Sequence, residues 1–205
     1  MIKFTGKGVY GGIAIGKVSV FKRGDIRVKK EKIEDAGACA SWNLSGDLEI
    51  MDCSRKVAVP SFVNMHTHSP MTLMRGLGED MAFHEWLKRI WEVEEKIDNE
   101  YVYWATMVAC LEMIKTGTTT FNDHYWHFES SIKAARDMGM RIASGYDIMD
   151  RCNPEEAIRQ KLQCEEKSSR YLGKTDENVI YQLALHAIYS SSEEMLVWAG
   201  EFAAK

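Results

Sequence analysis

From residue 57 onward the chain alternates short apolar segments with longer segments whose apolar residues recur every three or four positions. The short segments have the length of buried strands, and the longer ones have the periodicity of helices that cover a sheet. Strands are predicted at residues 57–68, 118–123, 141–147 and 178–185. Helices are expected between and after them, at residues 83–96, 98–116, 129–138, 153–173 and from 191 onward. This alternation indicates βα units and a parallel sheet.

Residues that favour helix ends support these boundaries. Asp98 can cap the start of one helix, and Gly117 follows its last turn. Asn153, followed by a proline and two glutamates, predicts another helix start, with Gly173 at its end. The segment 191–194 has the sequence of a capping box for a last helix.

Four βα units are half of an eight-stranded barrel. We therefore expect an α/β fold, a partial TIM (β/α)8 barrel of the first four βα units, preceded by a small β-rich N-terminal segment. Polar residues follow each predicted strand: His66 and His68, then Asp123 and His124, then Asp147, then His186. Barrel enzymes build their sites from the carboxyl ends of strands, so these residues are candidates for one site.

The pair His66 and His68 is the strongest chemical signal in the chain. Side chains of an extended strand alternate between faces, so both imidazoles point the same way and can bind one metal ion. Neutral imidazoles suit zinc, and iron or manganese are alternatives. A pair of solvated loop histidines is the other interpretation that the spacing permits.

The apolar run 57–65 with Pro60, the His66-Thr-His68 motif and the following segment 69–78 resemble the first barrel strand and loop of the amidohydrolase superfamily. They are most similar to the branch that deaminates S-adenosylhomocysteine, methylthioadenosine and related adenosines. The resemblance implies that His66 and His68 are the first two metal ligands. It also implies that a third histidine, an aspartate, a proton-transferring glutamate and another histidine lie on later strands, beyond residue 205, so the chain alone is expected to be inactive.

The same resemblance implies three substrate contacts. Trp86 matches a tryptophan of the base pocket, and Glu94 matches an acid that accepts hydrogen bonds from ribose hydroxyls. The spacing from Trp86 is one residue shorter than usual, which leaves Glu95 as an alternative. His186 matches a substrate-facing histidine, although Ile188 stands where the motif has a proline.

The N-terminal segment permits two interpretations, and we expect domains at 1–48 and 49–205. Residues 4–37 resemble the opening of enzyme I of the bacterial phosphoenolpyruvate sugar phosphotransferase system, which would make this segment foreign and the reading frame chimeric. Alternation over residues 25–38 equally predicts a β-hairpin of the kind with which amidohydrolases begin. The glycines of residues 6–16 fit turns between short strands.

Composition narrows the function classes. The chain has 205 residues, 45% hydrophobic and 27% charged, which is ordinary for a globular protein, and its net charge of −4 gives no footprint for nucleic acid. Its five dispersed cysteines favour a reducing cytoplasm, and no apolar stretch has the length of a membrane span. The resemblance implies a small nucleoside-type molecule as the partner, and the open edges of a half barrel predict self-association. Another amidohydrolase, such as a guanine deaminase or triazine chlorohydrolase, and a non-catalytic fragment remain the alternatives.

Overall fold

The computed structural model of the protein describes residues 2–6, 9–10, 20–21, 24–29, 32–37, 49–53, 56–171, 174 and 176–204. The chain divides into two compact units, Met1–Ser61 and Phe62–Lys205, each of which is described by itself.

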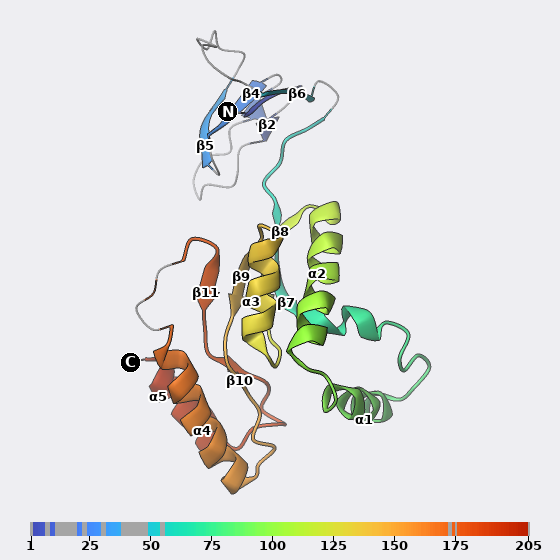
Figure 1. The fold of residues 1–205 in the computed structure, drawn as a ribbon, viewed down its shortest axis with the longest axis vertical. Coiled ribbons are helices and arrows are strands. Elements are labelled where there is room, and N and C mark those ends of the chain that lie inside the picture. Colours follow the sequence, from blue (N-terminus) through green and yellow to red (C-terminus); the bar gives the residue numbers. More distant parts are fainter. Residues whose placement is uncertain are drawn as a thin grey trace. The chain divides into compact units, whose positions relative to one another are not determined.

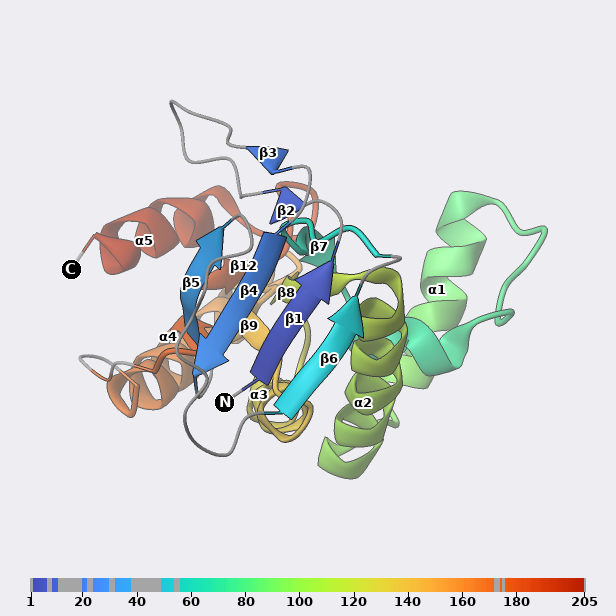
Figure 2. The ribbon, with the colours of Figure 1, turned by 90° about the horizontal axis from the view of Figure 1, so that it is seen from above.

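The first unit contains a four-stranded sheet in the order β5-β4-β1-β6, whose strands lie side by side in Figure 2. The strands of this unit are β1 (Ile2–Gly6), β2 (Val9–Tyr10), β3 (Val20–Phe21), β4 (Gly24–Lys29), β5 (Lys32–Gly37) and β6 (Glu49–Cys53). Strands β4 and β5 pair antiparallel, which confirms the hairpin expected over residues 25–38. Strand β6 pairs parallel with β1, so residues 49–53 belong to this sheet and the unit extends past the boundary expected after residue 48. Most of the glycine-rich segment 6–16 lies outside the described residues.

The second unit is built on a parallel sheet in the order β11-β9-β8-β7, so sequential strands are neighbours as expected. Its strands are β7 (Phe62–Thr67), β8 (Thr118–Asp123), β9 (Arg141–Ser144), β10 (Asp147–Ile148), β11 (Val179–Tyr181) and β12 (Ala184–Leu185). Beyond β9 and β11 the chain continues as the parallel pair β10 and β12.

The third and fourth predicted strands are therefore interrupted, which corrects the expectation of continuous strands over 141–147 and 178–185. Both breaks lie where Gly145 passes the backbone of Gln182. A Cβ atom at Gly145 would lie 1.6 Å from the carbonyl oxygen of Gln182, so only glycine permits this close approach.

The helices of the second unit are η1 (Ser69–Met74, a 3-10 helix), α1 (Phe83–Glu94), α2 (Asn99–Thr116), α3 (Phe128–Asp137), α4 (Pro154–Ser169) and α5 (Glu193–Ala203). The predicted caps Asp98 and Asn153 accept backbone N–H groups of α2 and α4, and Gly117 ends α2 at a φ of 89°. Helix α5 is capped by Ser192 and not by the expected Ser191, because the Ser192 hydroxyl accepts the Met195 N–H. Gly173, the expected end of α4, lies outside the described residues.

Helices α2 and α3 pack against each other and against β8 and β9, as Figure 1 shows. The core between them contains the buried residues Cys110, Phe121, Phe128, Ile132, Ala135, Met140, Ile142 and Val179. A second core cluster joins α4 and α5 to the end of β10 through Ile148, Ala157, Cys164 and Met195. These two cores fix the strand ends from which the polar residues project. The described cysteines are free, and none of the described helices combines the length and apolar character needed to cross a membrane.

Candidate functional site

The carboxyl ends of the strands in the second unit bring four histidines into one row. The ring centres of His66 and His68 lie 5.1 Å apart, those of His68 and His124 5.9 Å, and those of His124 and His186 5.6 Å. His66 lies in β7, and His68, His124 and His186 directly follow β7, β8 and β12. The structure thus brings together the histidines that follow the strand ends, including His124, for which the sequence indicated only a position after a strand.

His68 is oriented by a backbone contact. Its Nδ1 lies 2.7 Å from the carbonyl oxygen of His124, and since a carbonyl can only accept, Nδ1 donates the proton. The other ring nitrogen, Nε2, is then left with a free lone pair. Metal-binding histidines are commonly oriented in this way, with one nitrogen donating to a carbonyl and the other free for the ion.

His66 and His68 are therefore candidate ligands of a divalent ion. His66 is exposed, and its imidazole lies next to that of His68. In the part of the chain that the structure describes, no three histidine, cysteine or acidic side chains converge closely enough to hold an ion. The described residues thus supply two candidate ligands and not a complete coordination sphere.

Asp123, which also follows a strand, has a structural position. Its side chain is fully buried and accepts hydrogen bonds from the backbone N–H of Ser69 at 2.7 Å and from the Ser69 hydroxyl at 2.8 Å. Burial raises the pKa of this carboxyl, and the bonds from Ser69 oppose the shift. Asp123 fixes the first turn of η1, which begins directly after His68.

A cleft of about 220 Å³ opens beside His68. It is lined by His68, Met71, Phe83, Trp86, Leu87, Ile90, Trp91, Glu94, His124, Tyr125, Trp126, Asp147, Met149, His186 and Tyr189. The three residues expected to contact substrate, Trp86, Glu94 and His186, all line this cleft. It combines apolar and aromatic walls with a few polar groups, which is the usual character of a small-molecule site.

Glu94 is held in the cleft by Tyr125, whose hydroxyl donates to its Oε1 at 2.8 Å. Partial burial raises the pKa of Glu94, and the hydrogen bond from Tyr125 counteracts the shift. Glu95 is exposed and lines only a neighbouring cavity of about 450 Å³. Of the two acids that the spacing allowed, the structure therefore places Glu94 in the cleft.

His124, which is partly buried, and the buried Asp147 form a polar pair at the cleft. His124 Nε2 lies 3.1 Å from Asp147 Oδ1, and neither atom has a hydrogen-bond partner within the described residues. Burial raises the pKa of Asp147 to about 8 and lowers the pKa of His124 to about 4. Burial thus favours the neutral form of both groups. Their positions directly after strand ends were the only sequence signal for them.

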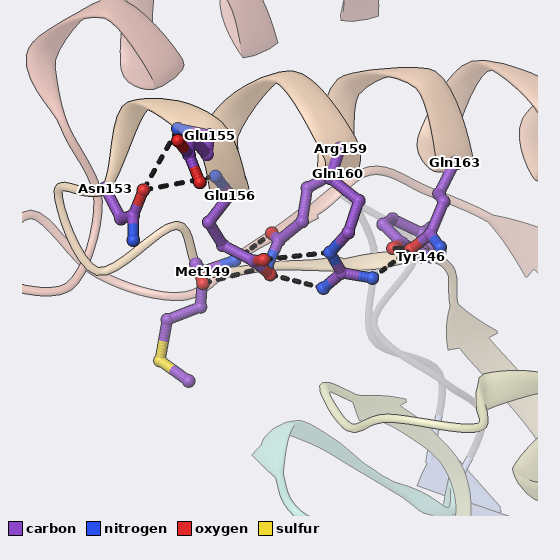
Figure 3. A network of polar contacts seen from close by, with 8 residues as sticks. All are labelled: Tyr146, Met149, Asn153, Glu155, Glu156, Arg159, Gln160 and Gln163. Atoms are coloured by element: carbon purple, nitrogen blue, oxygen red, sulfur yellow. Dashed lines mark hydrogen bonds and ion pairs between the residues drawn. The ribbon is translucent and has the colours of Figure 1, made fainter.

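Contacts from α4 hold the segment that carries Asp147, as Figure 3 shows. The side-chain amide of Gln160 accepts the Met149 N–H at 2.8 Å and donates to the Met149 carbonyl at 2.9 Å. Glu156 accepts a hydrogen bond from Gln160 and forms an ion pair with Arg159. This network fixes the backbone two residues after Asp147, at the border between the two cavities.

Strand-end histidines on a parallel α/β sheet are the arrangement found in metal-dependent hydrolases built on barrels. The chain belongs to the amidohydrolase family, whose sequence model matches residues 57–205. It is 38% identical over 186 residues to a 5'-deoxyadenosine deaminase of Methanocaldococcus jannaschii, covering 90% of this chain and 44% of that protein. It is 37% identical over 194 residues to a 5-methylthioadenosine/S-adenosylhomocysteine deaminase of Pyrococcus abyssi, covering 93% of this chain and 45% of that protein.

Solved structures share the fold. An adenosine deaminase from Xanthomonas campestris with bound zinc superimposes with a TM-score of 0.82 at 23% identity, covering 99% of this chain and 46% of that one. A guanine deaminase from C. acetobutylicum gives a TM-score of 0.77 at 21% identity, covering 98% of this chain and 50% of that one. The chain thus spans about half the length of the proteins that it matches.

These matches bear on the N-terminal segment. The match to the Pyrococcus abyssi relative covers 93% of the chain, so most of residues 1–48 must lie inside it. That coverage argues against a foreign, enzyme I-like origin of residues 4–37 and against a chimeric reading frame.

Proposed function

We propose that this chain is the first half of a metal-dependent hydrolytic deaminase that acts on adenosine-type nucleosides such as 5'-deoxyadenosine, methylthioadenosine or S-adenosylhomocysteine. The observation that carries the proposal is the single cleft that brings His68, Trp86, Glu94 and His186 together. The names of the relatives at 36–41% identity support the adenosine-type substrate.

In this proposal His66 and His68 hold the ion, and the His124 carbonyl keeps His68 Nε2 free for it. Zinc fits two neutral imidazoles, and a bound divalent ion lowers the pKa of its water so that water can attack near neutral pH. Trp86 offers an aromatic face for the purine base. Glu94, fixed by Tyr125, accepts hydrogen bonds from ribose hydroxyls.

We also propose that the second unit is an open half of a barrel. Strand β7 stands at one end of the sheet order, and its apolar residues Phe62, Val63 and Met65 are 64%, 54% and 69% exposed. An open edge with apolar residues favours association, either with the rest of a barrel or with another copy. Light scattering on the 205-residue chain tests this: association is expected, and a monodisperse monomer at all concentrations would count against open edges.

Function is tested with the chain extended by the second half of the fold and loaded with zinc. Ammonia release is measured with methylthioadenosine, S-adenosylhomocysteine, 5'-deoxyadenosine and guanine, and chloride release is measured with a chlorotriazine. Ammonia from the adenosine-type compounds alone supports the proposal. Turnover confined to guanine or to the triazine would replace it with one of the other amidohydrolase activities.

A further inference from the structure

The ring of His186 is held by a serine in the loop that follows it. His186 Nδ1 lies 2.7 Å from the hydroxyl oxygen of Ser190, and that oxygen also lies 3.1 Å from the carbonyl oxygen of Ala187. The three groups form a short chain that runs from imidazole to hydroxyl to carbonyl.

The protons in this chain can be counted. The Ala187 carbonyl can only accept, and it receives the Ser190 backbone N–H at 3.2 Å as well as the single hydroxyl proton of Ser190. The Ser190 oxygen is then an acceptor for a proton on His186 Nδ1. With this assignment every group has a partner. The reverse assignment turns the serine proton toward Nδ1 and places an N–H on Nε2. That N–H would face the cleft that the imidazoles of His68 and His124 also line.

Ser190 is fixed by contacts that do not involve His186. Its carbonyl accepts the Arg151 N–H at 2.9 Å. Asp150, which is fully buried, accepts the backbone N–H of Ser192 at 2.9 Å, the Ser192 hydroxyl at 2.5 Å and the Cys152 N–H at 3.1 Å. The loop after His186 is therefore anchored to the loop after β10.

The imidazole itself is confined by aromatic neighbours. The ring of His124 lies 5.6 Å from the His186 ring at a tilt of 50°, and the ring of Tyr189 lies 5.8 Å away at 86°. With Nδ1 turned to Ser190, the remaining nitrogen, Nε2, is the one available to the cleft that His186 lines.

We propose that Ser190 is a positioning residue that holds His186 in the tautomer with the proton on Nδ1, so that Nε2 accepts a hydrogen bond from a donor group of the bound ligand. The matching ligand group is a hydroxyl or an amino N–H. This role in binding rests on the proposed function, whereas the tautomer is a property of the free chain and is measured without any activity.

The test is a long-range ¹⁵N–¹H correlation spectrum of the histidine-labelled 205-residue chain at about pH 8, where an ordinary imidazole is neutral. Variants are Ser190→Ala, Ser190→Thr, which keeps the hydroxyl, and Ser191→Ala. Ser191 is the matched control because it is equally buried and its hydroxyl has no hydrogen-bond partner within the described residues. His68 is an internal reference, since its Nδ1 donates to a backbone carbonyl that no variant removes.

In the wild-type chain, His186 Nδ1 is expected at the frequency of a protonated nitrogen and Nε2 at that of an unprotonated one. Ser190→Ala should shift the tautomer ratio of His186 toward Nε2–H by about fivefold to tenfold, the factor that one neutral hydrogen bond contributes. Ser190→Thr should restore the wild-type ratio, and Ser191→Ala should leave it unchanged.

Three results would overturn the proposal. The first is a wild-type His186 with its proton on Nε2, which the wild-type spectrum alone decides even if a variant fails to fold. The second is a folded Ser190→Ala chain with an unchanged ratio. The third is a Ser191→Ala chain that shifts His186 as much as Ser190→Ala does, because the effect would then be a general disturbance of the loop.

Discussion

Replacement of Asp123 by alanine tests how the structure supports His68. The Asp123 carboxylate accepts both the backbone N–H and the hydroxyl of Ser69, the residue that follows His68. In the alanine variant the Ser69 N–H would be buried without a partner. The Ser69 hydroxyl would keep only its 3.1 Å contact with Thr106.

The expected loss of stability follows from these contacts. A buried donor without a partner costs about 1–3 kcal/mol, and each hydrogen bond to a charged group contributes about 1.5–3 kcal/mol. Relief of the buried carboxylate offsets part of this loss, since burial raises the pKa of Asp123. We expect a net loss of about 3 kcal/mol for Asp123→Ala and about 1 kcal/mol for Asp123→Asn, which can still accept the Ser69 N–H.

The assay is urea unfolding of the chain, followed by tryptophan fluorescence and circular dichroism, with stability compared at equal m values. The control is Asp137→Ala, the same chemical change at an exposed aspartate that contacts Lys133 and Tyr103. Exposed pairs contribute little, so the control should unfold at the wild-type midpoint. A midpoint for Asp123→Ala no lower than that of Asp137→Ala would refute the reasoning.

Three further predictions concern the cleft. Gly78→Ala should displace Trp86, because Gly78 has a φ of 144° and an added Cβ would lie 2.8 Å from Trp86 Cδ1; an unaltered tryptophan emission spectrum would contradict this. Tyr125→Phe should raise the pKa of Glu94 further by removing a bond that lowers it, and a carboxyl ¹³C titration that shows no rise would refute the contact. Asp147, with its pKa raised to about 8, binds its proton more tightly when folded, so its contribution to stability should decline as pH rises from about 4 to about 8, whereas the lowered pKa of His124 acts in the opposite direction up to about pH 6.5. Asp147→Asn should flatten that decline in urea midpoints, and an unchanged slope would show that Asp147 is not its source.

Sequence patterns predicted the features that depend on local structure. The strand over 118–123 was predicted as a short segment between two helical ones, and the hairpin over 25–38 from its alternating residues. Both were confirmed. The caps at Asp98 and Asn153 follow from side chains that bond to their own helix, so they need no knowledge of the rest of the fold.

Features that depend on contacts between distant segments could not be predicted in this way. The breaks in the third and fourth strands come from the close approach of Gly145 to Gln182, which no single segment reveals. The last helix is capped by Ser192 and not by the predicted Ser191. Ser192 is also held by Asp150, 42 residues earlier, and this contact is not visible in the local sequence.

The candidate site also combines features set by local sequence with features set by contacts between distant segments. A repeat of two residues placed His66 and His68 together, since strand geometry is local. The pairing of His124 with Asp147 required the register between β8 and the chain after β9, so the sequence indicated both residues only as polar positions after strands. The choice of Glu94 over Glu95 depended on the contact with Tyr125.

We propose that His66 and His68 bind the metal of an adenosine-type deaminase and that this chain provides its nucleoside cleft. The most direct test measures bound zinc and ammonia release from methylthioadenosine together, in the chain extended by the second half of the fold and in its His66→Ala and His68→Ala variants. Bound zinc and steady deamination are expected in the extended protein, with loss of both in each variant and no measurable deamination by the 205-residue chain alone, whose described residues offer no third ligand. Deamination that persists at the wild-type rate in either variant, or in the 205-residue chain, would contradict this proposal.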